Sequence, residues 1–156
     1  MKPLDDAART LALELLAQVE ELSLATVRPD GYPQATTVNF ASDGLTLYVG
    51  IGLDSQKAHN IRQEPRVSLT VCPANLPWDR IRALSMGGRA DIIADADEMA
   101  RAASHLMKRF PQLAALQEGT TALPWAGALF IRITPEVISV IDYEQGFGHS
   151  ALYSLP

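Results

Sequence analysis

The sequence predicts a mainly β, α+β protein: a six-stranded antiparallel barrel covered by helices. Three observations lead to this prediction. Apolar and polar residues alternate in several short runs, which is the period of a half-buried strand. The first of these runs are separated by tight turns, which only antiparallel strands can use. The sequence also lacks a GxGxxG motif and regular βα alternation, so a Rossmann fold is not expected.

Length and composition suit a single globular domain over residues 1–156. A net charge of −5 with scattered Lys and Arg residues argues against a nucleic-acid surface. Cys72 is the single cysteine, so no internal disulfide is possible and a reducing compartment is expected. The start of the chain lacks the apolar stretch of a signal peptide, and no run approaches a membrane span. We therefore expect a cytoplasmic protein without membrane or nucleic-acid partners.

The first part of the chain predicts one helix followed by a three-stranded antiparallel meander. Apolar residues recur at helical spacing from Leu4 to Glu20, and two early aspartates suit the positive end of the helix dipole. The apolar period then changes to two. Turns at Arg28–Gly31 and Ser42–Gly44 separate three expected strands, Leu22–Arg28, Tyr32–Ala41 and Leu45–Gly52.

The second part predicts two more helices and three more strands. Asp54 or Ser55 caps a short helix that runs to Gln63, and Asp95 caps a longer helix that stops at Pro111. Glycines 87 and 88 predict a bulge or a barrel corner in the fifth strand, and Pro135 predicts a bulge or an edge position in the last. The three expected strands are Arg66–Cys72, Ile81–Ile93 and Gly127–Tyr143.

The stretch between Leu47 and Asn60 predicts a phosphate site. A strand ends there in Gly50 and Gly52, and a helix then begins at Ser55 with Gln56 and Lys57. A helix start offers unpaired N–H groups and a positive dipole end, to which a hydroxyl and a cation are added. The glycines leave room for a flat group beside the strand. The residues alone leave an alternative open, in which Ser55 is only a cap and Lys57 is only solvated.

From about Leu22 to Val71 the sequence resembles the pyridoxamine 5′-phosphate oxidase-like FMN-binding split barrels. The resembling pieces are LATVRPDGYPQATTVNF, LTLYVGIG and SQKAHNIRQEPRVSLTV; the later pieces SMGGRADII and FIRITPEVISVIDY follow the family pattern loosely. The resemblance implies a six-stranded antiparallel split β-barrel that binds FMN. It also implies a homodimer, with each flavin in a groove between the subunits.

The resemblance implies roles for eleven residues. Ser55 and Lys57 would bind the FMN phosphate, with Gln56 nearby. Residues beside the isoalloxazine ring and the ribityl chain would be Thr36, Thr37, Val38, Tyr48, Val49 and Gly50. Arg82 and Ser85 would reach the flavin of the partner subunit.

The sequence departs from true pyridoxamine-phosphate oxidases in three places. Thr36 stands where those enzymes carry an arginine for the phosphate, and their S-R-K is S-Q-K here. Their C-terminal substrate motif is replaced by the segment 146–149, with the sequence GFGH. We therefore do not expect vitamin B6 oxidase activity, and we expect weaker FMN binding than in that enzyme.

The segment 146–149 predicts a catalytic role for His149. The two glycines let the backbone turn and present Phe147, and a histidine next to them can transfer a proton near neutral pH. We expect this segment at the mouth of the flavin groove, reaching the partner's site. The alternative is a strap that only seals the partner subunit. Some haem-handling split barrels also resemble the chain in a Gly-Phe-Gly segment.

The remaining reactive residues have simpler explanations. The histidines 59, 105 and 149 lack the spacing of a zinc site, so no metal is expected. Cys72 is expected to pack, and the acidic residues around Asp95 are expected to cap a helix. Trp78 and Trp125 lie in proline-containing loops, where each either plugs the core or contacts a ring or a partner.

These features predict an FMN-dependent oxidoreductase or flavin-binding protein that acts on an unidentified small molecule. Three alternatives stay open. The first is a haem-binding or haem-degrading split barrel with His149 as a ligand. The second is a non-enzymatic flavin-binding stress or storage protein. The third is a deazaflavin cofactor in place of FMN.

Overall fold

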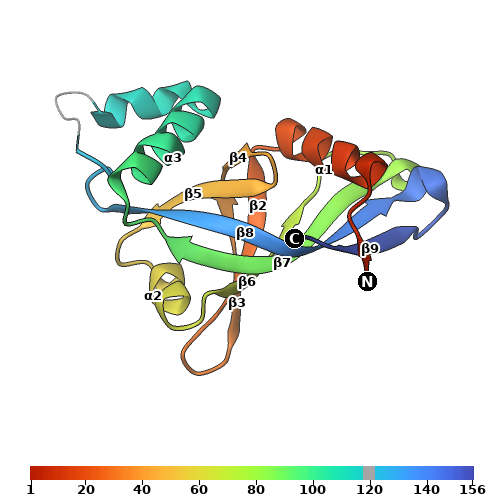
Figure 1. Ribbon diagram of the computed structural model, residues 1–156, viewed down its shortest axis with the longest axis horizontal. Coiled ribbons are helices and arrows are strands. Elements are labelled where there is room, and N and C mark those ends of the chain that lie inside the picture. The colour runs from red at the N-terminus through yellow and green to blue at the C-terminus, as the bar shows by residue number, and fades with distance from the viewer. Residues whose placement is uncertain (118–121) are drawn as a thin grey trace.

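The structure, a computed structural model, describes residues 1–117 and 122–156 and confirms the mainly β, α+β class (Figure 1). The α-helices are α1 (Asp6–Gln18), α2 (Gln56–Gln63) and α3 (Ala96–Arg109), and the 3₁₀ helices are η1 (Trp78–Arg80), η2 (Pro111–Gln117) and η3 (Tyr143–Gln145). The strands are β1 (Lys2–Pro3), β2 (Glu21–Val27), β3 (Pro33–Asn39), β4 (Ala41–Asp43), β5 (Thr46–Gly52), β6 (Arg66–Val71), β7 (Arg82–Ile92), β8 (Ala128–Asp142) and β9 (Ser150–Ser154).

The sheet has nine strands, so the predicted count of six is too low. Short strands β1, β4 and β9 were not expected as separate strands. The main path runs β1-β9-β8-β7-β6-β2-β3, and β5 pairs with β4 and β8. The long strand β8 is shared: its first half pairs with β5 and its second half pairs with β9, while β7 follows most of its length (Figure 1).

The predicted meander of the first three strands is wrong in one respect. β3 pairs with β2 as expected, but it does not continue to β5. The chain bends at Phe40, whose side chain is fully buried, and the three residues that follow form β4 on the edge of β5. The barrel is therefore not closed. β3 and β5 approach each other at a seam, but no ladder joins them among the described residues.

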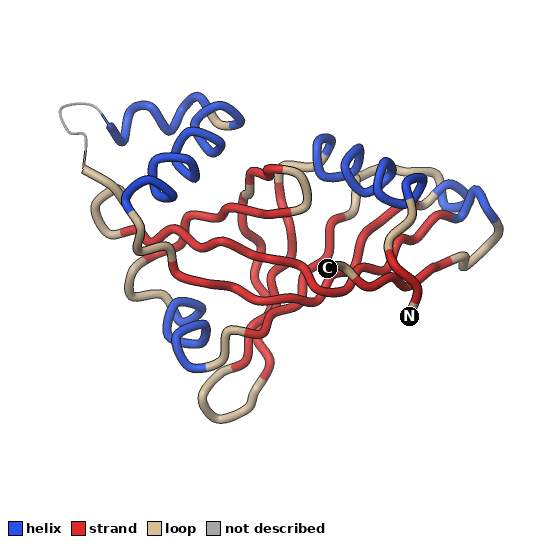
Figure 2. The backbone as a smooth tube through the Cα atoms, viewed as in Figure 1, coloured by secondary structure: helices blue, strands red, loops and turns tan. Residues whose placement is uncertain are grey.

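Two apolar clusters hold the elements together. The larger fills the barrel beneath α1 and includes Leu16, Leu24, Val49 and Ile133. The smaller lies beneath α3 and is built around residues Tyr48, Leu106, Trp125 and Phe130. In the view of Figure 2, α1 and α3 lie above the long strands, and α2 lies below β5, β7 and β8, beside the β2–β3 hairpin. Burial of this apolar surface is the main favourable term in folding.

Arg109, in the last turn of α3, links this helix to the end of α1. Its guanidinium donates hydrogen bonds to the carbonyl oxygens of Leu16 (2.9 Å), Ala17 (3.4 Å) and Val19, at the end of α1. It also lies 4.8 Å from the ring centroid of Phe40. The last turn of α1 has no basic residue of its own, so Arg109 supplies both the donors and the charge that a helix C-terminus favours. Burial lowers the pKa of Arg109 from its ordinary value.

The irregularities predicted at Gly87–Gly88 and at Pro135 are one β-bulge, whose extra residue lies on β8. The register of β7 against β8 shifts there: Gly87 pairs with Val137 and Gly88 with Pro135, so Glu136 is the extra residue. A Cβ atom on Gly88 would lie 2.3 Å from the carbonyl oxygen of Thr134. Only glycine therefore fits at this crossing of two backbones.

Gly88→Ala should lower the free energy of unfolding by about 1–3 kcal/mol, the usual cost of overpacking a protein interior. The control is Gly50→Ala, whose new Cβ would meet nothing closer than Phe130 Cδ1 at 4.0 Å. We expect the control to change stability by no more than about 0.5 kcal/mol. Urea unfolding of both variants measures the difference, and equal midpoints would contradict the clash.

Candidate functional site

A groove of about 480 Å³ lies at the open seam between β3 and β5. Its strand walls are Thr37, Val38, Asn39, Gly50, Ile51 and Gly52; its other walls are Lys57, Leu106, Phe110, Gln112, Leu113, Leu116, Trp125, Ala126, Gly127 and Ala128. Thr37, Asn39 and Lys57 thus place polar groups on the side of the strands and α2, while apolar side chains from α3 and η2 line the opposite side. Four predicted site residues, Thr37, Val38, Gly50 and Lys57, meet here.

The strand walls offer backbone groups to a ligand. β3 is hydrogen-bonded on its β2 side, and β5 beyond Tyr48 is hydrogen-bonded on its β8 side. An edge strand presents a row of N–H and C=O groups on its free side. Gly50 and Gly52 add no side chain that would block access to this edge. A flat heterocycle with alternating donors and acceptors can therefore pair with main-chain groups at the seam.

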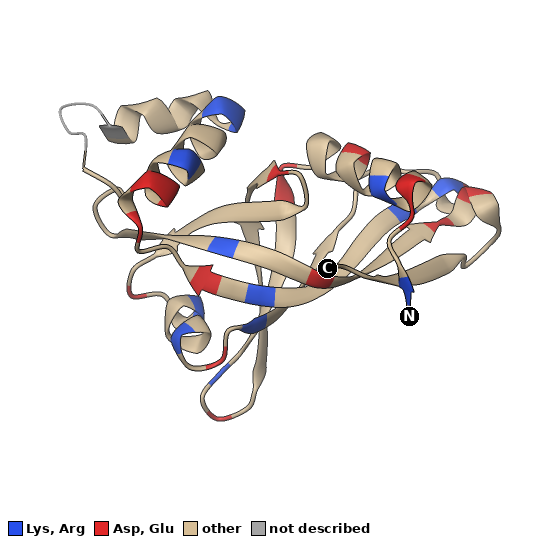
Figure 3. Cartoon of the chain, viewed as in Figure 1, with Lys and Arg blue, Asp and Glu red and all other residues tan. Residues whose placement is uncertain are grey.

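The start of α2 closes one end of the groove. Ser55 is the N-cap: its hydroxyl accepts a hydrogen bond from the Ala58 N–H (3.3 Å) and donates one to the Gly52 carbonyl oxygen (2.8 Å). This settles the open choice between Asp54 and Ser55. α2 carries Lys57 and Arg62 but no acidic residue, as Figure 3 shows.

Lys57 is the cation of the groove. Its side chain is partly buried, and its ammonium group has no hydrogen bond or ion pair to any other described residue. It stands in the first turn of α2, where the backbone N–H groups and the helix dipole also favour an anion. An unpaired, partly buried ammonium group at such a position favours a phosphate or a carboxylate as its partner.

A second orphaned polar group borders the groove. Trp125 is only 6% exposed, and its indole N–H has no hydrogen-bond partner among the described residues. Its ring packs edge-to-face on Phe130, with the ring centroids 5.0 Å apart. The sequence had left Trp125 open as a plug or a ring contact; the structure makes it both a core residue and a wall of the groove.

Five predicted site residues near the seam do not line the groove: Ser55 and Gln56 at the start of α2, and Thr36, Tyr48 and Val49 on the strands. Thr36 is half-buried on β3 and is not among the residues that line the groove. Val49 is fully buried in the barrel core. Tyr48 is covered by α3, where its ring stacks on His105 with 5.7 Å between centroids and 16° between planes.

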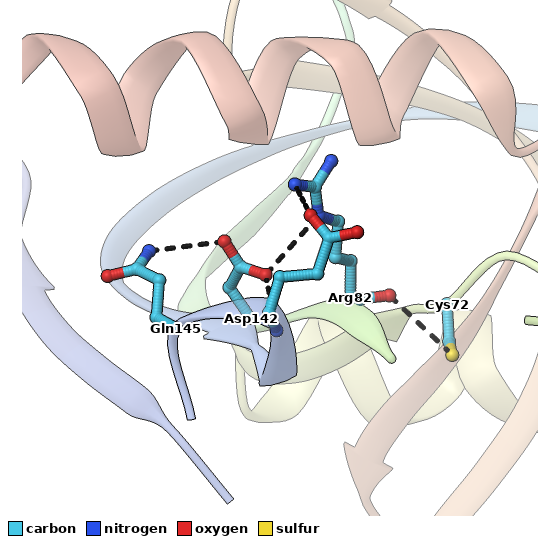
Figure 4. Close-up of polar contacts among 5 residues, drawn as sticks. Cys72, Arg82, Asp142 and Gln145 are labelled. Carbon is cyan, nitrogen blue, oxygen red and sulfur yellow. Dashed lines mark hydrogen bonds and ion pairs between the residues drawn. The ribbon is translucent and has the colours of Figure 1, made fainter. Parts of the chain in front are cut away.

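Arg82, Ser85 and His149 also lie away from the groove of their own chain. Arg82 and His149 line a separate cavity of about 490 Å³ between α1 and the strands β8 and β9. Ser85 is exposed on β7. Figure 4 shows that Arg82 is already engaged, because its guanidinium forms ion pairs with Asp142 (3.3 Å) and Glu144.

Asp142 is the centre of that polar cluster. It is 5% exposed and accepts hydrogen bonds from the Gln145 side chain (3.1 Å), the Glu144 N–H (3.1 Å) and Arg82 (3.3 Å) (Figure 4). Burial alone would raise the pKa of Asp142. The hydrogen bonds and the charge of Arg82 outweigh it, so the pKa of Asp142 lies below its ordinary value of 3.8.

The segment 146–149 is a turn between η3 and β9 rather than a loose tail. Gly146 and Gly148 have φ of 137° and 75°, conformations that favour glycine. Phe147 is 72% exposed and contacts Trp78 and Tyr143, with ring centroids 4.8 and 5.4 Å away. β9, which continues the chain from this turn, was missed because a five-residue strand carries too weak an alternation.

Another cavity, of about 680 Å³, is a less suitable anion site. Cys72 is exposed, so the expectation that it packs is wrong; the cavity lies beside it, along β2 and β6. Its charged lining residues are Glu20 and Glu21, which disfavour a phosphate. No group of three His, Cys, Asp or Glu side chains in the described ranges is arranged to hold a metal ion, and no helix there is long and apolar enough to cross a membrane.

These features define a split β-barrel whose open seam ends at the start of α2, beside the ammonium group of Lys57. The pyridoxamine 5′-phosphate oxidase family model matches residues 10–142. The chain therefore belongs to the pyridoxamine 5′-phosphate oxidase family, as its resemblance predicted. None of the curated proteins compared matches it.

Solved structures agree on the fold. A putative pyridoxamine 5′-phosphate oxidase from Listeria innocua has a TM-score of 0.66 at 23% identity, over 85% of this chain and 97% of that one. A haem-binding protein from Mycobacterium smegmatis has a TM-score of 0.75 at 18% identity, over 97% of this chain and 59% of that one. An F420 reductase has a TM-score of 0.60 at 29% identity, over 80% and 93%.

Asp142 predicts a pH dependence of stability. Folding lowers the pKa of the Asp142 carboxyl, so the ionised form of this carboxyl stabilises the folded protein. This stabilisation is fully present above the pKa of the unfolded chain, near 3.8, and is lost as the pH falls through the pKa of the folded protein. The stability difference between the wild type and Asp142→Asn should be largest near neutral pH and should shrink below pH 3.8. Urea midpoints measured from neutral pH downwards test this, with the exposed Asp54→Asn as control. A constant difference across the range would contradict it.

Proposed function

We propose that this protein is an FMN-binding protein of the oxidoreductase type, which holds the flavin in the groove at the seam. The observation that carries the proposal is the free ammonium group of Lys57 at the start of α2, at the end of a groove with glycine walls. The donor set fits the cofactor: a cation and helix N–H groups for the phosphate, and open strand edges for the ring.

Few protein groups are available to bind the phosphate at this end of the groove, which supports weak rather than tight FMN binding. Lys57 is the one Lys or Arg side chain among the described residues that line the groove. The Ser55 hydroxyl is already bonded to the Gly52 carbonyl oxygen, although it retains acceptor capacity. A dianionic phosphate with one protein cation keeps part of its hydration, so its affinity is lower than at a site with several cations.

The end of the groove that would hold the flavin ring offers more contacts than the phosphate end. Gly50 and Gly52 let a flat ring approach the β5 backbone, and Thr37 and Val38 provide the opposite strand edge. Leu106, Phe110 and Leu113 offer an apolar wall for the hydrocarbon part of such a ring. When bound, a flavin supplies one- and two-electron redox chemistry; this chain contributes binding, orientation and exclusion of water.

A deazaflavin is the second candidate, because the F420 reductase has the highest identity of the three neighbours described above and the same groove chemistry suits its phosphate. Haem is less well supported by the groove, since no histidine lines it among the described residues. The absorption spectrum of purified protein mixed with each cofactor distinguishes the three. Unchanged spectra and no binding of any flavin would overturn the proposal.

Lys57→Ala should weaken FMN binding by about 1.5–3 kcal/mol, the contribution of a hydrogen bond to a charged group. This corresponds to roughly 10- to 150-fold in the dissociation constant. Riboflavin, which lacks the phosphate, should bind the variant and the wild type equally. Flavin fluorescence titration measures both ligands, and Lys108→Ala, an exposed cation on α3, is the control.

Gly50→Ala complements this experiment. It places a methyl group in the ring end of the groove without a clash in the protein itself. FMN and riboflavin should therefore lose affinity by the same factor in this variant. If Lys57→Ala weakens neither ligand, or both equally, the phosphate does not bind at α2.

We further propose that the protein is a homodimer, in which Arg82, Ser85 and His149 of one subunit approach the flavin groove of the other. Exposed aromatic side chains support a contact near His149, because Trp78 and Phe147 are 70% and 72% exposed and touch each other. In that arrangement His149 delivers a proton to the substrate or the reduced flavin.

His149→Ala should then slow flavin reoxidation or substrate turnover by roughly 10²-fold, the low end for acid–base catalysis, with FMN affinity unchanged. Stopped-flow absorbance measures the rate, and light scattering measures the oligomeric state of the same sample. His59→Ala, an exposed histidine on α2, is the matched control. A monomer at micromolar concentration, or an unchanged rate, would remove His149 from the site.

A further inference from the structure

Asn60, on the second turn of α2, is a fully buried polar residue with every strong donor of its side chain in use. Its exposed fraction is 0%. Its amide nitrogen donates to the Thr26 hydroxyl (2.9 Å) and to the Gln34 side-chain oxygen (3.1 Å). Its amide oxygen accepts a hydrogen bond from the Gln56 side chain (2.8 Å). This network joins α2 to both β2 and β3.

Packing alone does not explain an asparagine at this position. The neighbouring helix residues Ala58 and Ile61 are buried and apolar, and they already anchor α2 to the barrel core. A buried amide is costly unless it is hydrogen-bonded, whereas an apolar side chain of similar size would carry no such cost. The directional bonds of Asn60 instead specify how α2 is rotated and how far it lies from the two strands.

The network connects the two walls of the groove. Gln34 lies on β3, three residues before Thr37, which lines the groove. Gln56 is the first residue of α2, next to Lys57. Asn60 bonds to both Gln34 and Gln56. The distance between the ammonium group of Lys57 and the edge of β3 therefore depends on these bonds.

The same contacts change the interpretation of Gln56. The resemblance placed Gln56 near the phosphate, in the position where related enzymes carry an arginine. In the structure its amide nitrogen is directed to Asn60 rather than left free beside Lys57. Gln56 thus has a partner within the protein, in contrast to the ammonium group next to it.

We propose that Asn60 is a positioning residue for the phosphate end of the groove, and that Gln56 acts through Asn60 rather than by touching the ligand. This inference rests on the proposed function, because it assigns a role in the same site. Asn60 holds the first turn of α2 so that Lys57 and the helix N–H groups face the groove at a set distance from β3. The ring end of the groove does not depend on it.

Two ligands separate positioning from stability. FMN and riboflavin share the ring and differ in the phosphate. Asn60→Leu removes the network at similar side-chain size, and it should weaken FMN binding about tenfold while riboflavin binding changes less than twofold. The matched control is Ile61→Val on the same helix, which loosens the packing of α2 but keeps the network. It should lower the melting temperature and leave the ratio of the two affinities unchanged.

Gln56→Ala provides a second variant that does not disturb the core, because Gln56 lies at the surface. Alone, it should weaken FMN binding about threefold. In the Asn60→Leu background it should have no further effect, since the two residues then act through one network. The same threefold loss in both backgrounds would show that Gln56 contacts the phosphate directly and would overturn the assignment.

The outcomes also separate this inference from the proposed function. A wild-type protein that binds FMN no more tightly than riboflavin has no phosphate site at α2, which overturns the proposed function and this inference together. A wild type that prefers FMN, combined with an Asn60→Leu variant that loses both ligands equally or neither, overturns the positioning role alone.

Discussion

The arrangement of this protein depends on an interaction that is not made: no ladder joins β3 to β5 among the described residues. A closed barrel would satisfy every backbone group and leave no place for a ligand between the strands. Here the two edges stay apart, α3 and η2 cover one side, and α2 ends the opening. The place where the sheet is incomplete is therefore also the place where the chain can bind a flat molecule through its main chain.

The bend at Phe40 produces this opening. The chain leaves β3 there and gives only three residues to the edge of β5, which leaves Gly50 to Gly52 without a partner on that side. Phe40 is held beneath the guanidinium of Arg109, which also binds the end of α1. The shape of the seam thus depends on a contact between residues that are far apart in the sequence.

Local chemistry was predictable from the sequence. A helix cap at Asp54 or Ser55, the cap at Asp95 and the irregularity at Gly87 and Gly88 each follow from a few neighbouring residues, and the structure shows all three, with Ser55 as the first cap. The family and the phosphate-binding candidate Lys57 also followed from short motifs. Each of these predictions needed no knowledge of which strands become neighbours.

The features that the sequence did not predict are those that depend on residues far apart in the chain. The pairing of β4 with the edge of β5 depends on the bend at Phe40, and no turn motif in the sequence predicts this bend. Tyr48 alternates correctly for a groove residue, but α3 covers it, and that cover comes from a helix fifty residues later. Arg82 was an attractive cation in the sequence, yet its two carboxylate partners lie about sixty residues further on.

The fifteen-residue strand β8 has a consequence for how such proteins diverge. One continuous strand forms a wall of the seam at its start and pairs with β9 at its end. Its side chains alternate inside and outside within each half, and the phase of this alternation shifts once, at Glu136. A single-residue insertion or deletion within it would exchange the inward and outward residues of one half. The bulge at Glu136 accommodates one such extra residue, opposite Gly87 and Gly88, and a Cβ atom on Gly88 would clash with the β8 backbone. Changes of chain length during evolution should therefore accumulate in the connections, such as the turn at Asp30, and should spare β8.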